Sequence, residues 1–204
     1  LHTATIPYTF YNVRTGVNDK IAFKADGTPY KFSLDAGNYS ATGLASVIKT
    51  NLDAVSGLTA TIDYSRETMK FGFTLTGITS FEFDMRTTNN NGADLLGMYD
   101  TDVLTIPMNT KTLTPKAIDL NESIHGLYIR QNIATAGTLD NESGVFTNIL
   151  ARLPITTNAG GIIFFTPSSN DHETMVSVPV INTIGIRLTD DRNRSIDLNG
   201  HHFQ

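Results

Sequence analysis

The sequence contains no cysteine among its 204 residues. This absence excludes disulfides, thiolate catalysis and zinc sites with cysteine ligands. It does not fix the compartment, because reducing and oxidising environments both tolerate a cysteine-free fold. Apolar runs are interrupted well before the ~18 residues that suggest a transmembrane helix, so we expect no membrane span. Residue 1 is Leu rather than Met, which leaves room for residues upstream, and no signal-peptide pattern is present.

Charge is also scarce, since only 17% of the residues are charged, with a net charge of -5. Lys and Arg are scattered singly, without a basic stripe that would neutralise phosphates, so we expect no direct nucleic-acid binding. Polarity comes instead from 29 Thr and 17 Asn. Threonine favours strands and asparagine favours turns. The composition therefore predicts a globular protein dominated by β-structure with many connections.

The last third of the chain carries strand patterns. Apolar residues alternate at Ile184, Ile186 and Leu188, which is the period of a half-buried strand. A polar turn at 191–194 and a return strand from Ser195 predict a hairpin. Strand runs are expected at about 3–13, 103–108, 124–133, 146–155, 161–166, 173–180, 182–190 and 195–203. Eight short strands with irregular connections predict a jelly-roll β-sandwich. Pro7 limits the first of them to an edge position or an interrupted ladder.

The period changes between residues 30 and 100. Ser40 is a helix N-cap candidate, and Gly57 stands where a left-handed C-cap is expected. The helical face between them consists of Leu44, Val47, Ile48 and Leu52. Alternating runs then follow at 60–64, 69–75 and 81–85, with a short helical turn at 93–98. The sequence thus predicts residues 30–100 as an inserted α+β unit of one helix and three antiparallel strands. Residues 1–29 and 101–204 would form the sandwich.

Clusters that could carry chemistry are few. Asp171, His172 and Glu173 are adjacent, but neighbours on an extended chain point to opposite faces, so a solvated loop is favoured. The same alternation separates His201 from His202 and favours an exposed strand end over a metal site.

For three further sets of residues, a functional site is the alternative to a purely structural role. The turn with Asp190, Asp191, Asn193 and Asp197 lacks the bidentate Glu of an EF-hand, so a hairpin turn is favoured over calcium binding. Asp63 and Glu67 flank a hairpin as a conceivable carboxylate pair. The aromatic runs can be either core or a carbohydrate-stacking platform; they comprise Phe71, Phe73, Phe81 and Phe83. We therefore predict no catalytic, cofactor-binding or metal-binding residues and no cofactor.

Several short segments together resemble penton and minor capsid proteins of double-stranded DNA viruses of the virophage, polinton-like and giant-virus group. They are Ile6–Val13, Phe32–Ser40, Leu95–Met98, Leu127–Arg130, Ile149–Ile155, Ile186–Asp190 and Ile196–Gly200. The resemblance implies a single jelly roll assembled as pentamers at capsid vertices, with no catalytic residues to carry over.

Three hypotheses follow for the function. The first is a virion structural protein, a penton or minor capsid subunit that forms a homopentamer and contacts a neighbouring major capsid protein. The second is a viral or phage fibre or tail module that binds a host receptor or glycan. The third is a lectin-like or carbohydrate-active enzyme domain, since jelly rolls host many functions. We expect the first, and therefore a structural protein of the virion rather than an enzyme.

Overall fold

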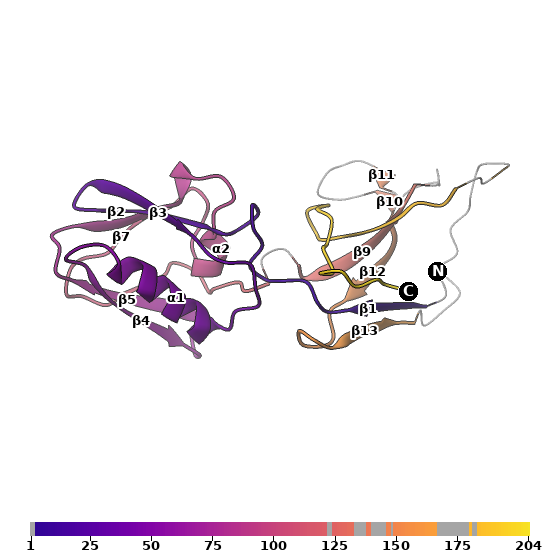
Figure 1. The fold of residues 1–204 in the computed structure, drawn as a ribbon, viewed down its shortest axis with the longest axis horizontal. Helices are drawn as coiled ribbons and strands as arrows, with labels where there is room; N and C mark the ends of the chain where they lie inside the picture. Colours follow the sequence, from indigo (N-terminus) through magenta and orange to yellow (C-terminus); the bar gives the residue numbers. More distant parts are fainter. Residues whose placement is uncertain are drawn as a thin grey trace. The chain divides into compact units, whose positions relative to one another are not determined.

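The chain folds into two compact units (Figure 1). The computed structural model describes residues 3–121, 124–132, 138–139, 146–147, 149–166, 180 and 183–204. One unit, called the sandwich unit here, combines Leu1–Phe10 with Ser123–Gln204. The other, called the inserted unit, is the continuous segment Tyr11–Glu122. Each unit has its own buried apolar cluster.

The inserted unit contains two antiparallel sheets and two α-helices. The first sheet has the order β3-β2-β6-β7 and consists of β2 (Lys20–Ala25), β3 (Thr28–Ser33), β6 (Phe81–Asp84) and β7 (Val103–Thr105). The second has the order β4-β5-β8 and consists of β4 (Thr59–Ser65), β5 (Lys70–Thr76) and β8 (Thr112–Leu113). The helical elements are α1 (Ala41–Asp53), the 3-10 turn η1 (Met85–Thr87) and α2 (Ala93–Leu96).

Helix α1 begins and packs as its sequence predicts. The Ser40 hydroxyl accepts a hydrogen bond from the Gly43 amide, which satisfies one of the free donors of the first turn. Leu44, Ile48 and Leu52 are fully buried along one face. The predicted cap at Gly57 is wrong, because the C-cap is Ala54 in a right-handed conformation. Gly57 has a φ of +85° but lies further along, in the turn that leads to β4.

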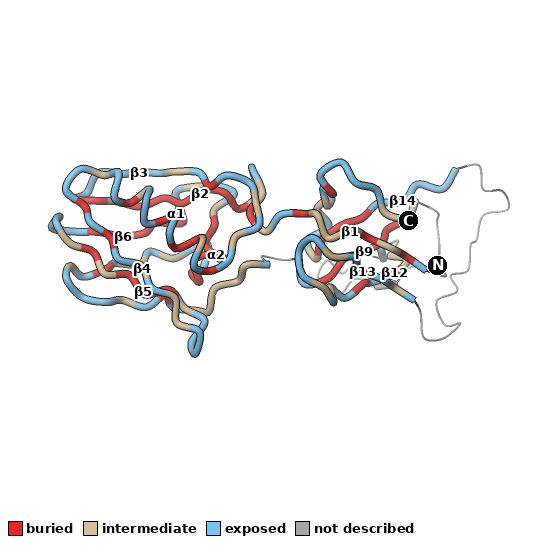
Figure 2. The backbone as a smooth tube through the Cα atoms, turned by 60° about the horizontal axis from the view of Figure 1, so that its bottom comes forward, coloured by how far each residue is buried: buried red, intermediate tan, exposed pale blue. Residues whose placement is uncertain are grey.

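Aromatic rings fill the core of the inserted unit. Phe83 contacts Phe73 and Phe81 with ring centroids 5.1 and 4.9 Å apart, both edge to face. Phe23 stacks on Phe81 at 5.3 Å. These rings come from both sheets, so they hold the two layers together, and Figure 2 shows buried stretches along their strands. The alternative of a carbohydrate-stacking platform is therefore wrong for Phe71, Phe73, Phe81 and Phe83, none more than 2% exposed.

The sandwich unit is built from antiparallel strands. β1 (Ala4–Pro7) pairs with β13 (Ile162–Phe165). A second sheet has the order β12-β9-β14 and consists of β9 (Gly126–Gln131), β12 (Ile149–Pro154) and β14 (Ile186–Thr189). β10 (Thr138–Leu139) pairs antiparallel with β11 (Phe146–Thr147). Apolar side chains from both sheets share one core, among them Ile6, Leu127, Ile129, Leu153, Ile163 and Leu188.

The end of the chain closes the sandwich beside β1. Thr5 and Gln204 exchange two backbone hydrogen bonds, of 2.6 and 2.9 Å. Thr189 bridges to Ser195 across the turn at 191–194, so the predicted hairpin forms. The predicted strand at 195–203 does not form as a regular strand: Ser195 makes a single bridge, and the Ile196 amide donates to the Leu188 carbonyl oxygen at 3.0 Å. The expected run at 173–180 lies outside the described residues except for Val180.

The β-dominated sandwich with a helix-containing insertion is confirmed, but the predicted pairing of the insertion is wrong. The predicted hairpin of β4 and β5 forms, with Ser65 opposite Lys70 and the turn at 66–69. The third predicted strand, β6, pairs instead with β2 and β7, while β5 takes β8 as its other neighbour. Alternation specifies which face of a strand is buried, and it leaves the partner open.

The boundaries of the insertion also differ from 30 and 100. The observed division follows Phe10 and Glu122, so β2 and β7 belong to the inserted unit. Their side chains explain this, because Phe23 of β2 and Leu104 of β7 lie directly opposite Phe83 of β6. Both strands are needed to complete the sheet that covers the aromatic core.

Candidate functional site

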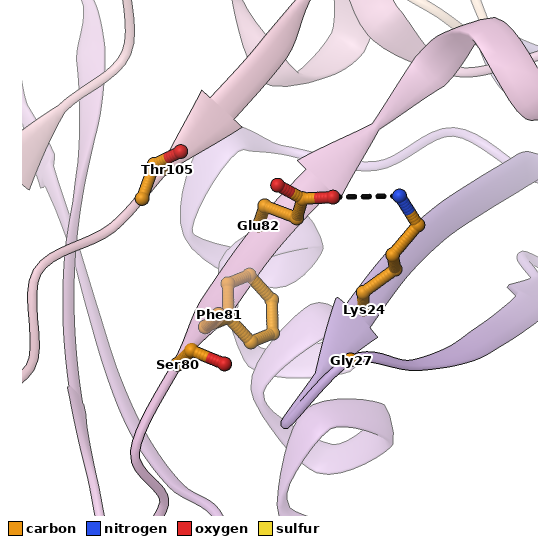
Figure 3. A pocket seen from close by; sticks show the side chains of 6 residues that line it. All are labelled: Lys24, Gly27, Ser80, Phe81, Glu82 and Thr105. Atoms are coloured by element: carbon orange, nitrogen blue, oxygen red, sulfur yellow. Dashed lines mark hydrogen bonds and ion pairs between the residues drawn. The ribbon is translucent and has the colours of Figure 1, made fainter.

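A hollow lies on the inserted unit, on the face of the β3-β2-β6-β7 sheet that points away from the core. It measures about 410 Å³ and is lined by Lys24, Gly27, Ser80, Phe81, Glu82 and Thr105 (Figure 3). Phe23 and Phe83 face the core from neighbouring positions. Strand alternation therefore turns Lys24 and Glu82 to the opposite face, where they meet.

Four charged side chains along this face form what we call the Lys24 cluster: Lys24, Glu82, Asp84 and Arg86. The Lys24 Nζ donates to Glu82 Oε1 at 2.7 Å and to Asp84 Oδ2 at 3.3 Å. Arg86 donates two hydrogen bonds to Asp84, from Nε to Oδ1 at 2.9 Å and from Nη2 to Oδ2 at 3.1 Å. The two cations balance the two carboxylates, so the cluster carries no formal net charge.

The hydrogen bonds of the Lys24 cluster fix its protonation states. The Arg86 guanidinium lowers the pKa of Asp84 to about 2, with Lys24 acting in the same direction and burial opposing both. The hydrogen bonds to Glu82 and Asp84 raise the pKa of Lys24. Asp84 therefore stays ionised and Lys24 stays protonated at neutral pH. Such groups are poor general bases and acids, which operate best with a pKa near the working pH. The cluster fits a rigid polar contact surface.

Substituting Asp84 by Asn should cost about 1–3 kcal/mol at pH 7, because a nearly buried carboxylate loses charged hydrogen bonds to Arg86 and Lys24. The pKa of Asp84 is lowered in the folded state, so its contribution to stability is present above pH 4 and is lost as pH falls toward about 2. Urea unfolding of both proteins at several pH values measures this. The stability difference between them should shrink on acidification.

Glu82→Gln is the matched control for this experiment. It removes one partly exposed ion pair to Lys24 and should cost about 1 kcal/mol or less. Equal losses for the two variants, or a stability difference for Asp84→Asn that is constant from pH 7 to pH 2, would contradict the role assigned to Asp84.

The rim of the hollow is held by a hairpin turn. Asp26 and Gly27 have φ values of +49° and +76°, as a two-residue Asp-Gly hairpin requires. The Asp26 carboxylate accepts hydrogen bonds from the amides of Thr79 (2.8 Å) and Ser80 (2.9 Å). The Thr79 hydroxyl is the main cause that lowers the pKa of Asp26. The turn between β2 and β3 is thereby tied to the start of β6.

The histidines expected at loop or strand ends are only partly described. Asp171, His172 and Glu173 lie outside the described residues. His201 and His202 are both exposed. Within the segments that the structure describes, no three His, Asp or Glu side chains gather in the manner of metal ligands. Over the same segments, neither α-helix has the length and hydropathy that crossing a bilayer requires.

The acidic turn at 190–197 is organised by hydrogen bonds from the protein itself. The fully buried Asp190 accepts from the amides of Arg192 (3.0 Å) and Arg194 (2.8 Å) and from the Arg194 Nε (2.7 Å). Asp191 faces His125, with 3.0 Å between Oδ2 and Nδ1. Asp197 accepts from the Asn199 amide. The hairpin-turn interpretation therefore describes the geometry better than a calcium loop does.

The carboxylates Asp63 and Glu67 do not form a pair with each other. Asp63 makes an ion pair with Lys111 at 3.1 Å, and Glu67 accepts a hydrogen bond from the Ser65 hydroxyl at 2.9 Å. Both lie at an exposed hairpin. Each is accounted for by a local structural contact.

Comparison with known proteins finds a similar fold among solved structures. No protein-family model and no curated protein matches the sequence. Five chains among solved structures do match, and one of them is the selenomethionine-labelled mavirus penton protein. The match covers 94% of this chain and 79% of the penton chain, with a TM-score of 0.51 and 12% sequence identity. The two chains share a fold. The resemblance to penton proteins that the short sequence segments suggested is thus confirmed at the level of the fold.

Proposed function

We propose that this chain is a structural subunit of a virus capsid, a penton or minor capsid protein placed at the vertex. The observation that carries the proposal is the extent of the match to the mavirus penton protein. At 94% of this chain, the match includes most of both the sandwich unit and the inserted unit. Since sandwiches alone host many functions, the combination with an α+β insertion is the more informative feature.

The chemistry of the inserted unit supports a structural role over catalysis. Its hollow is lined by Lys24, and hydrogen bonds to Glu82 and Asp84 raise the pKa of Lys24, so that it stays protonated at neutral pH. Rigid, charge-balanced surfaces of this kind contribute specificity at protein contacts more than affinity. We accordingly infer that the chain has a structural role in the virion shell, in contact with other capsid proteins.

A vertex subunit of this kind would assemble as a homopentamer. A closed ring requires a heterologous interface, in which two different patches of each subunit meet around a rotation axis. Both patches would lie on the sandwich unit, as the jelly-roll interpretation implies. The inserted unit would then remain available for other contacts, including a host receptor or glycan.

The mass of the protein in solution tests the proposal. We expect light scattering over a concentration series to rise from the 22.3 kDa of one chain toward five times that value. Electron microscopy of the largest species should show five-fold rings. A stable trimer would instead favour the fibre or tail hypothesis. A chain that stays monomeric at every concentration and hydrolyses a glycan would overturn both.

A further inference from the structure

Three arginines lie on the outer face of the β12-β9-β14 sheet, the face that points away from the sandwich core. Core-facing residues on these strands include Ile129, Leu153 and Leu188. The alternate positions place Arg130 on β9, Arg152 on β12 and Arg187 on β14 on the other side. Together with Tyr128 we call these residues the arginine face; Figure 2 labels their three strands.

Strand pairing places these arginines at neighbouring positions of the sheet. Arg187 is directly opposite Arg130, and Arg152 is directly opposite Tyr128. The guanidinium carbons of Arg130 and Arg152 both lie 5.8 Å from the centroid of the Tyr128 ring. Like charges directly opposite each other on neighbouring strands destabilise a sheet. The pair of Arg130 and Arg187 therefore carries a cost within the isolated subunit.

The described residues supply the arginine face with neutral partners. The Arg130 Nε donates to the Thr189 hydroxyl at 3.0 Å, and the Arg187 Nη2 donates to the side-chain Oδ1 of Asn193 at 3.0 Å. No ion pair to a described carboxylate is formed by Arg130, Arg152 or Arg187. This contrasts with the compensated charges of the Lys24 cluster. Arg130 is only 8% exposed, and a buried charge is costly without a counter-charge.

A pocket of about 430 Å³ opens beside two of these arginines. It is lined by Arg130, Gln131, Asn132, Gly185, Ile186 and Arg187. Cationic groups, amide groups and one exposed apolar side chain, Ile186, thus border a space of side-chain size. An acidic side chain with an apolar neighbour fits this set of contacts.

We propose that the arginine face binds carboxylates of a second copy of this chain. This inference rests on the proposed capsid function, since it assigns one of the two patches that a closed ring needs. A second copy has the required charge, because the chain carries 20 acidic against 15 basic residues. Within the described part of the sandwich unit, Asp197 is an exposed carboxylate.

The choice of arginine supports recognition of carboxylates. All five Lys and Arg residues of the sandwich unit are arginines, namely Arg130, Arg152, Arg187, Arg192 and Arg194. A guanidinium presents a planar fork that matches a carboxylate through two hydrogen bonds, and it stacks on aromatic rings as seen at Tyr128. A nucleic-acid backbone is the less suitable partner, since the chain is acidic overall and the pocket is small.

Charge reversal of the exposed members tests the inference. The double variant Arg152→Glu, Arg187→Glu should raise the concentration at which half of the protein is assembled by at least tenfold. Arg66→Glu is the control for an arginine-to-glutamate reversal away from the arginine face, at an exposed hairpin of the inserted unit, although it makes half of the charge change of the double variant. That control should assemble like the unmodified chain. Assembly of the unmodified chain should weaken from 0.05 to 0.5 M NaCl, and the double variant should lose most of this salt dependence.

The possible outcomes separate this inference from the proposed function. An unmodified chain that never assembles overturns the capsid proposal and the inference together. An unmodified chain that forms rings, alongside a double variant with unchanged assembly, overturns the inference alone. Binding of a fluorescent DNA duplex at physiological salt, lost in the double variant, would overturn it in favour of a nucleic-acid surface. The melting temperature of the monomer should not fall in the variant, because a like-charge contact is removed.

Discussion

Replacing Phe83 by alanine should destabilise the inserted unit by about 3–5 kcal/mol, the usual cost of deleting a buried aromatic side chain. Phe83 is fully buried and lies in the middle of the ring cluster, in contact with Phe73 and Phe81. Its removal leaves a cavity between two sheets, where both layers would have to move to refill the space. Urea unfolding combined with hydrogen exchange locates the loss. Amides of β2, β5 and β6 should lose protection first.

Phe164→Ala makes the same chemical change at a side chain that is 70% exposed on β13. At a protein concentration below assembly, this control should cost less than about 1 kcal/mol. A loss for Phe83→Ala as small as that of the control would contradict the packing of the ring cluster. Equal loss of protection in both units would show that they unfold as one cooperative body.

Replacing Gly77 by alanine should destabilise the inserted unit by about 3 kcal/mol or more. Gly77 has a φ of +91°, which L-residues rarely adopt. A Cβ added there would lie 2.0 Å from the carbonyl oxygen of Gly57. The obstacle is backbone rather than a flexible side chain, so the turns after α1 and β5 would have to separate. Thermal unfolding monitored by circular dichroism measures the loss.

Gly57→Ala provides the control for this close approach. Gly57 also has a positive φ, of +85°, but the nearest atom to its added Cβ is the Gly77 carbonyl oxygen at an ordinary 3.5 Å. It should therefore show only the conformational cost of about 1–2 kcal/mol. The difference between the two variants isolates the steric clash. A larger loss at Gly57 than at Gly77 would mean that the two turns do not meet in this way.

Local signals in the sequence predicted local structure well. The hydroxyl of Ser40 and the spacing of Leu44, Ile48 and Leu52 were sufficient to place helix α1, because capping and periodicity act within a few turns. The hairpin of β4 and β5 followed from two alternating runs joined by four residues. The failed cap at Gly57 has a local reason too. Helix α1 ends before Gly57, and the positive φ of Gly57 belongs to the turn that faces Gly77.

Pairing between distant strands could not be predicted in the same way. Nothing near β6 indicates that Phe83 will lie opposite Phe23 rather than beside β5. The arginine face was missed for the same reason. Arg130, Arg152 and Arg187 are separated by more than twenty residues in each case and look like scattered single charges until β12, β9 and β14 pair. The available signal was compositional, since the sandwich unit uses arginine for every basic residue other than histidine.

The pairing of β1 also determines when the sandwich unit can complete its fold during synthesis on the ribosome. Pro7 of β1 can pair with Ile162 of β13 only after about 155 further residues have been synthesised, and Thr5 can bond to Gln204 only after Gln204 has been added. At ordinary rates of translation, of about 5–20 residues per second, the first delay amounts to roughly 10–30 s. The inserted unit is continuous and complete by then, so it can fold while β1 is still without a partner. During that interval β1 offers bare strand edges to other nascent chains, and Pro7, which has no amide hydrogen to donate, makes it a poorer template for their aggregation.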